Sequence, residues 1–120
     1  MPSIVVLDTL SPDGIALLES AKGRGIDYTV STGLAGDRLR DTLSRHDGAI
    51  CRSGVKITAD VLAGNQRLRA IVRAGVGTDN IDKEAATRLG IVVMNTPAGN
   101  TVSTAEHTFA MILSLSRNIA

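Results

Sequence analysis

Three short segments of this 120-residue sequence carry groups that bind anions. Arg52, Ser53 and Lys56 lie in the first, where Arg offers a planar, bidentate donor for a carboxylate or phosphate and Lys offers a point charge. Residues 75–80 contain two glycines and can present free backbone N–H groups in a concave turn. Residues 96–100 lead into a predicted helix, whose N-terminus also favours anions. Together the segments predict a binding site for a small anionic ligand.

Each segment follows an apolar run of the kind that forms a buried strand. Four of the five such runs are continuously apolar, as in parallel strands covered on both faces, whereas the mixed run at 26–30 is typical of an edge strand. Helix start signals lie between the runs, for example Ser11 before Pro12, and Thr58 and Asp82 as caps. The predicted strands are 4–7, 26–30, 49–51, 70–72 and 91–94, and the predicted helices are 12–22, 37–45, 59–62, 83–89 and 101–118.

This alternation predicts an α/β fold, a doubly wound parallel five-stranded sheet in a flavodoxin-like three-layer sandwich. Ligands of such sheets bind beyond the carboxyl ends of the strands. The three anion-binding segments follow the third, fourth and fifth strands, so we expect them to meet at one edge of the sheet.

Three other assignments of this strand and helix order fail on particular residues. A dinucleotide phosphate loop would need a third glycine where the chain has Asn80, and a helix opening inside the motif. A receiver domain would need a phosphate-accepting carboxylate after the third strand, where Cys51 and Arg52 stand. A flavin site would need aromatic side chains against the ring, but the chain has no tryptophan and its one tyrosine, Tyr28, lies in a predicted strand.

Composition excludes several classes of partner. The formal net charge is +1 and aromatic residues make up 2% of the chain, which argues against a nucleic-acid partner. No apolar run approaches the roughly 18 residues of a transmembrane helix, so no membrane partner is expected. The single cysteine, Cys51, allows neither a disulfide framework nor a cysteine-rich metal site, and a reduced, cytoplasmic setting is the simplest expectation.

Residues 52–58, 73–82 and 93–100 resemble the D-isomer-specific 2-hydroxyacid dehydrogenases, most closely their D-3-phosphoglycerate dehydrogenase branch. The resemblance covers the whole chain and is strongest from about Ala49 onward. It implies that residues 1–99 form a substrate-binding domain and that residues 100–120 form a helix crossing into an NAD-binding domain. The family's dinucleotide fingerprint and its catalytic arginine, glutamate and histidine lie beyond residue 120. The resemblance therefore implies no catalytic residue here, no NAD bound to this chain alone, and no activity without the rest of the enzyme.

The resemblance also assigns roles within the predicted site. The substrate is a small phosphorylated hydroxy acid, oxidised with NAD on the route to serine. Valine at position 76 replaces a threonine that is frequent in relatives, so one hydroxyl contact to the cofactor is lost. The implied substrate-binding residues are Arg52, Ser53 and Lys56 for the phosphate end, the amides of Gly75, Val76 and Gly77 for the carboxylate, and Asn100 at the cleft, with Val76 also facing the cofactor.

The predicted helix at 101–118 carries apolar residues at helical spacing, among them Phe109 and Ile112. Burying three such side chains contributes roughly 5 to 8 kcal/mol, so the helix should not remain in water. It either folds back over the sheet, which the short connection after the fifth strand favours, or pairs with a second chain in a homodimer. The alternative to a dehydrogenase part is a stand-alone binding or oligomerisation module, or a minimal fold, with no enzymatic role.

Overall fold

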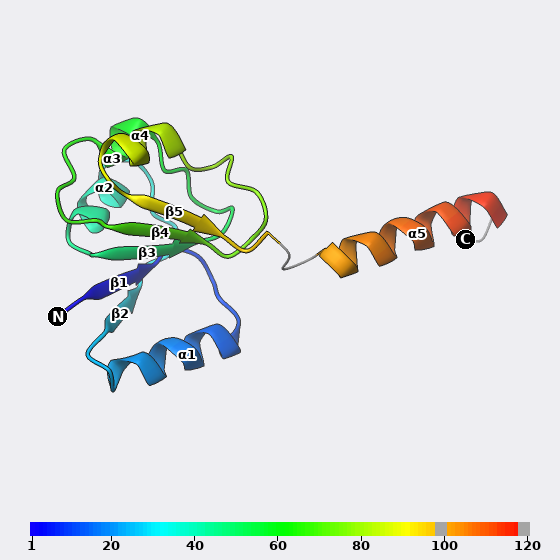
Figure 1. Ribbon diagram of the computed structural model, residues 1–120, viewed down its shortest axis with the longest axis horizontal. Helices are drawn as coiled ribbons and strands as arrows, with labels where there is room; N and C mark the ends of the chain where they lie inside the picture. The colour runs from blue at the N-terminus through cyan, green and yellow to red at the C-terminus, as the bar shows by residue number, and fades with distance from the viewer. Residues whose placement is uncertain (98–100, 118–120) are drawn as a thin grey trace.

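In the part of the chain that the computed structural model describes, residues 1–97 and 101–117, five parallel strands alternate with five helices (Figure 1). The strand order is β2-β1-β3-β4-β5, which confirms the predicted doubly wound α/β fold. The strands are β1 Ser3–Val6, β2 Asp27–Val30, β3 Gly48–Cys51, β4 Ala70–Arg73 and β5 Val92–Asn95. The helices are α1 Pro12–Lys22, α2 Gly36–Ser44, α3 Ala59–Leu62, α4 Lys83–Arg88 and α5 Thr101–Arg117.

Side-chain caps start three of these helices where the sequence predicts them. Ser11 Oγ accepts the N–H of Gly14 at 3.3 Å at the start of α1, and Thr58 Oγ1 accepts the N–H of Val61 at 3.4 Å in α3. Asp82 Oδ1 accepts the N–H of Ala85 at 3.0 Å at the start of α4. These bonds satisfy N–H groups that have no partner within the helix, and they fix where each loop after a strand ends.

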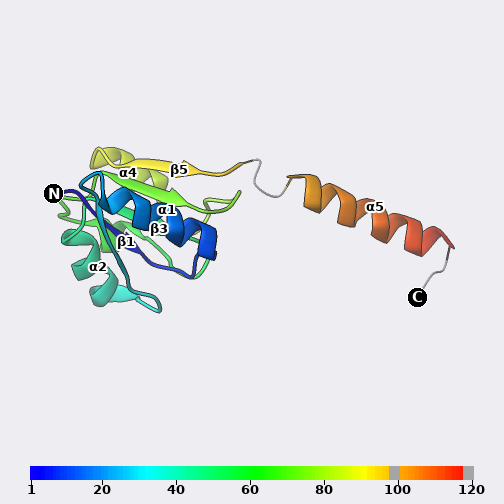
Figure 2. The same cartoon turned by 90° about the horizontal axis from the view of Figure 1, so that it is seen from below.

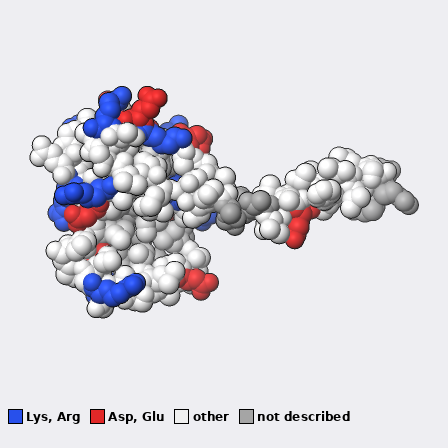
Figure 3. Space-filling view, in the orientation of Figure 1, with Lys and Arg blue, Asp and Glu red and all other residues white. Residues whose placement is uncertain are grey.

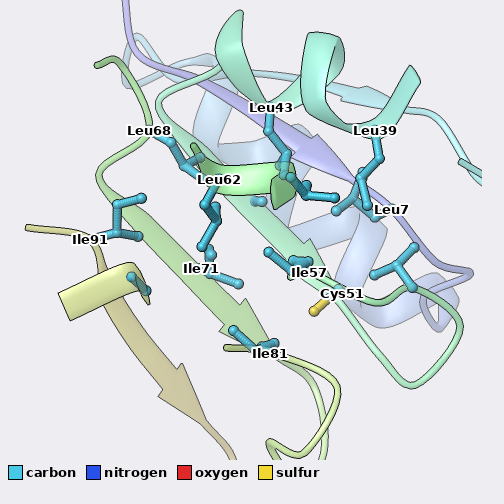
Figure 4. Packing of buried hydrophobic residues seen from close by; sticks show 14 of the residues in the cluster. Leu7, Leu39, Leu43, Cys51, Ile57, Leu62, Leu68, Ile71, Ile81 and Ile91 are labelled. Atoms are coloured by element: carbon cyan, nitrogen blue, oxygen red, sulfur yellow. The ribbon is translucent and has the colours of Figure 1, made fainter. Parts of the chain in front are cut away.

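The main core lies between the sheet and the layer formed by α2, α3 and α4 (Figure 1). Residues in register on β1, β3 and β4, namely Val5, Ala49 and Ile71, point to this side and are almost fully buried. Figure 4 shows how leucines from α2 and α3 and isoleucines from the strands and loops pack together there. The completely buried large side chains include Leu7, Leu39, Leu43, Ile57, Leu62 and Ile71.

The opposite face of the sheet is covered unevenly. One register row crosses the sheet from β1 to β5 and consists of Val6, Ile50, Val72 and Met94. Val6 is fully buried and Met94 is 46% exposed. The face is therefore closed near β1, on the side where α1 lies, and open near β5.

The expectation that the last helix folds back over this open face is wrong. Figures 1 and 2 show α5 extending away from the sheet in both views, and Phe109 is 68% exposed. Thr96, directly after β5, binds the turn after β4 through its N–H and Oγ1, both to the carbonyl of Gly75. Figure 3 shows the surface of α5 as almost free of charge. Its length and apolar content, like those of the other described helices, are too small for a membrane crossing.

Candidate functional site

Backbone hydrogen bonds join the loops after β3, β4 and β5 into one edge. Ala74 N–H donates to Cys51 O at 2.8 Å, so the chain after β4 starts beside the chain after β3. Thr96 N–H donates to Gly75 O at 3.0 Å and joins the loop after β5 to the same turn. The expected meeting of the three strand ends is therefore present.

Two side chains fix the loop that carries the predicted cations. Asp8, from the loop after β1, accepts the backbone N–H of Arg52 at 2.6 Å. Asn80, from the loop after β4, donates through Nδ2 to the carbonyls of Arg52 and Val55, both at 2.8 Å. The backbone of Arg52 is thus held directly against the loop that contains the two glycines.

Gly54 lies directly beside the Asp8 carboxylate. A Cβ at position 54 would collide with Oδ1 of Asp8. The Asp8 carboxylate therefore lies against the loop backbone, and a side chain at position 54 would force it to move from the N–H of Arg52 that it accepts.

The turn at 75–77 has its carbonyls bound and the amides of Val76 and Gly77 free. The Gly75 N–H, which the resemblance assigns to the carboxylate, donates instead to Arg73 O at 2.9 Å. The three carbonyls of the turn accept donors from outside it, namely the N–H and Oγ1 of Thr96 on Gly75, Nδ2 of Asn95 on Val76 and Nη1 of Arg73 on Gly77. Among residues 1–97 and 101–117, none accepts the N–H of Val76, Gly77 or Thr78. Neither glycine has the positive φ that permits unusual backbone geometry. A Cβ at 77 would lie 2.9 Å from Arg73 Nη1, so a side chain there would require the Arg73 guanidinium to shift.

A cavity of about 650 Å³ opens between the loops after β3 and β4. Ser53 and Lys56 line it together with Arg73, Asp79 and Asn80. Lys56 also lines a second cavity, of about 530 Å³, toward the start of α2. The structure thus brings Ser53 and Lys56 to one hollow, as predicted. Arg52 and residues 75–77, which were predicted to share this hollow, are not among the residues that line it.

The side chain of Arg52 contacts the loop after β1, whereas its backbone is bound by Asn80 in the loop after β4. Its Nη1 donates to the carbonyl of Thr9 at 3.4 Å, in the loop after β1, and the residue is exposed. The guanidinium is therefore held by one weak bond to a carbonyl, which leaves most of its donors open to solvent or to a ligand. Asn100, the remaining predicted site residue, lies outside the described residues.

Arg73 is a site residue that the prediction omitted. Its side chain is only 14% exposed, and Nη1 lies 3.4 Å from Oδ1 of Asp79, which is itself almost fully exposed. Its Nε is buried and has no partner among the described residues. The sequence did contain a signal for Arg73. It is a cation at the end of the apolar run 70–73, and a residue there lies at the carboxyl edge of the sheet.

Cys51 is the last residue of β3, next to this edge, and its thiol is part of the hydrophobic core. The thiol is fully buried, and burial raises its pKa to about 11, with the nearby Asp8 carboxylate adding to the effect and Arg73 opposing it. A neutral buried thiol is a poor nucleophile.

The glycine turn at 75–77 does not have the geometry of a dinucleotide phosphate loop. Such a loop requires a glycine turn that runs directly into a helix N-terminus, where the pyrophosphate binds. Here the glycine turn is followed by residues 78–82, which pair with the loop after β3 through Ile57 and Ile81, and α4 begins only at Lys83. The glycine turn therefore does not lead into a helix N-terminus.

Known proteins share both the sequence and the architecture of this chain. D-3-phosphoglycerate dehydrogenase of Synechocystis sp. is 40% identical over 99% of the chain, and that of Methanocaldococcus jannaschii is 42% identical over 99%. The chain spans about a fifth of the length of these relatives, 21% and 22% respectively. The NAD⁺-bound 3-phosphoglycerate dehydrogenase of Entamoeba histolytica superposes with a TM-score of 0.79 at 29% identity, covering 94% of this chain and 38% of that one.

The family described as D-isomer specific 2-hydroxyacid dehydrogenase, catalytic domain, matches residues 4–117, which is nearly the whole chain. The predicted resemblance is confirmed, and with it the parallel sheet whose carboxyl edge carries the donors described above. The chain belongs to the D-isomer specific 2-hydroxyacid dehydrogenases.

Proposed function

We propose that this chain is the substrate-binding part of an NAD-dependent D-3-phosphoglycerate dehydrogenase, which converts 3-phosphoglycerate to 3-phosphohydroxypyruvate for serine synthesis. The names of the relatives support the substrate. The observation that carries the proposal is the carboxyl edge, where the loops after β3, β4 and β5 are joined by hydrogen bonds and their cations and amides remain available. A cytoplasmic setting is part of the same proposal.

Each end of the substrate has a matching set of donors. We assign the phosphate end to Arg52, Ser53 and Lys56, because a dianion needs several charged donors. The carboxylate is assigned to the free amides of Val76 and Gly77. We also assign Val76, which is 42% exposed, to a contact with the nicotinamide, and Asn100 to substrate binding.

The division of the longer enzyme follows from the same resemblance. Residues 1–99 form the substrate-binding domain, and residues 100–120 pass into the NAD-binding domain, which supplies the hydride acceptor and the catalytic base. The exposed apolar side chains of α5, including Phe109 and Ile112, support packing against that domain or against a second copy in a homodimer. In light scattering over a range of concentrations, a dimer of this chain should dissociate in the variant Phe109→Asp.

Calorimetric titration of the 120-residue chain with 3-phosphoglycerate tests the substrate assignment. We expect binding of 3-phosphoglycerate and at least tenfold weaker binding of D-lactate, which has the carboxylate but lacks the phosphate and its charge-assisted hydrogen bonds. Equal affinity for the two ligands, or no binding of either, would contradict the assignment of residues 52–56 to a phosphate.

An assay of NAD reduction provides a second test of the proposed function. The chain by itself should show no reduction of NAD in the presence of 3-phosphoglycerate, because its residues include neither a dinucleotide cradle nor the family's catalytic residues. Turnover by protein free of host dehydrogenase would overturn this division of roles.

A further inference from the structure

Asn95, the last residue of β5, has no role in the proposed function, yet it contacts the turn that we assign to the carboxylate. Its Nδ2 donates to the carbonyl oxygen of Val76 at 2.8 Å. The side chain is exposed, so nothing in the core requires an amide there. Alanine or leucine would fill the end of an edge strand as well as asparagine does.

The hydrogen bond from Asn95 to the carbonyl of Val76 also affects the N–H of Gly77, because both groups belong to the same peptide. The C=O of Val76 and the N–H of Gly77 belong to one planar trans peptide and point in opposite directions. A donor that binds this carbonyl therefore also sets the direction of the Gly77 N–H. Because Gly77 lacks a Cβ, the peptide between the two residues can rotate at low cost unless it is held.

The two neighbouring peptides are held in the same manner. Thr96 binds the carbonyl of Gly75 through its N–H and its Oγ1, at 3.0 and 3.2 Å, and so sets the N–H of Val76. Arg73 binds the carbonyl of Gly77 and so sets the N–H of Thr78. The Gly77 N–H is the middle donor of the three, and Asn95 is the side chain that determines its direction.

We infer that Asn95 is a positioning residue, which directs the Gly77 amide toward the carboxylate of a small hydroxy acid by binding the carbonyl of Val76 from the other side. The carboxylate itself rests on the proposed function, whereas the control of the amide direction does not. The cost of orienting the donor is met before the ligand arrives, which raises affinity.

The variant Asn95→Asp tests the inference most sharply, because it keeps the shape of the side chain and replaces a donor with an acceptor. The new carboxylate should repel the Val76 carbonyl and attract the Gly77 N–H, so that the peptide turns over. In the amide NMR spectrum of the ligand-free chain, we expect the Gly77 resonance to move downfield and its hydrogen exchange to slow by tenfold or more. Gly77 exchange and shift that match the unmodified chain would overturn the inference.

The variant Asn95→Ala removes the donor without adding charge. We expect about fivefold to tenfold weaker binding of 3-phosphoglycerate, the effect of one lost hydrogen bond, with an unchanged midpoint of urea unfolding. Thr87→Ala is the matched control, because its exposed hydroxyl donates to a carbonyl at 2.8 Å on α4, away from the turn. Weakening by Thr87→Ala equal to that by Asn95→Ala would show that Asn95 acts only through general stability.

The two readouts separate failure of the inference from failure of the proposed function. If the unmodified chain binds no 3-phosphoglycerate, the proposed function fails, and the Gly77 amide still reports on Asn95 because that measurement needs no ligand. If the chain binds 3-phosphoglycerate but neither Asn95 variant alters the Gly77 amide or the affinity, the inference fails and the proposed function stands.

Discussion

The amino and carboxyl ends of the sheet differ in whether their charged and polar groups have partners within the protein. At the amino end, the carboxylate of Asp47 accepts the N–H of Ser3 at 2.8 Å and lies 3.3 Å from Nη2 of Arg67, so donors and acceptors meet within the protein. At the carboxyl end, Lys56 has no ion-pair or hydrogen-bond partner among residues 1–97 and 101–117, and neither do the amides of the turn at 75–77, Gly75 excepted.

This difference separates charges that stabilise the fold from charges that are available to a ligand. The pKa of Asp47 falls to about 2, mainly because Arg67 donates to it and also because Ser3 N–H does, which shows that the amino end already contains its counter-ion. The carboxyl end also contains acceptors, since Asp79 and Asp82 line the cavity there, but Lys56 and the N–H groups of Val76 and Gly77 are bound to none of the described residues and are available to an anionic ligand. Mutations at the two ends should therefore affect different quantities.

The largest effect is expected at Gly54, where the carboxyl end is most closely packed. In Gly54→Ala, the added Cβ collides with Asp8, so the loop at 52–56 must shift. We expect a loss of about 1–3 kcal/mol in the free energy of unfolding, as in other overpacked sites, and more than tenfold weaker binding of 3-phosphoglycerate. Urea unfolding and calorimetry measure the two quantities.

Gly23→Ala is the matched control for this variant. Gly23 follows α1 with φ −64°, and an added Cβ would have no neighbour closer than 3.7 Å, so no loss of stability or binding is expected. An unchanged unfolding midpoint and affinity in Gly54→Ala would contradict the close packing of Asp8 against the loop.

A pair of arginine variants tests the contrast between the ends directly. Arg52→Ala should weaken binding of 3-phosphoglycerate about tenfold or more, because a charge-assisted bond is lost, and should change stability little. Arg67→Ala should lower Tm by a few degrees and leave the affinity unchanged. If both variants altered the same quantity, the ends would not differ as proposed.

The smallest effect is a dependence of stability on pH that belongs to the amino end. The pKa of Asp47 is lower in the folded chain than its ordinary value of 3.8, so its contribution is complete above about pH 4 and is lost as the pH falls toward about 2. Glu19, whose pKa is lowered mainly by the Tyr28 hydroxyl and also by Lys22, acts in the same direction.

The isosteric variant Asp47→Asn isolates this contribution. It should be less stable than the unmodified chain at pH 6, and the difference should shrink as the pH falls from 4 to 2. Urea unfolding at several pH values measures it. A difference that stayed constant with pH would show that the Asp47 carboxylate is not the titrating group.

The sequence predicts the fold well because local signals agree with one another. Each predicted strand corresponds to an observed one, and Ser11, Thr58 and Asp82 cap the helices that they were expected to cap. The rejected dinucleotide loop is also explained, because residues 78–82 pair with Ile57 instead of opening a helix.

The parts that sequence reasoning missed depend on contacts between distant segments. Asp8 and Asn95 each bind a loop that follows a different strand from their own, and no local pattern in the sequence indicates such a pairing. The position of α5 was wrong for a related reason. Its apolar stripe shows that a partner surface is needed, but the stripe contains no information about which surface that is.

The central claim is that the carboxyl edge of this sheet is the ligand-binding edge. An amide NMR titration of the 120-residue chain with 3-phosphoglycerate tests it most directly, because every backbone N–H reports on its own surroundings. We predict shifts concentrated at residues 52–56 and 75–80, with none at Ser3, Asp47 or Arg67. Shifts confined to the amino end, or a spectrum unchanged at saturating ligand, would contradict the claim.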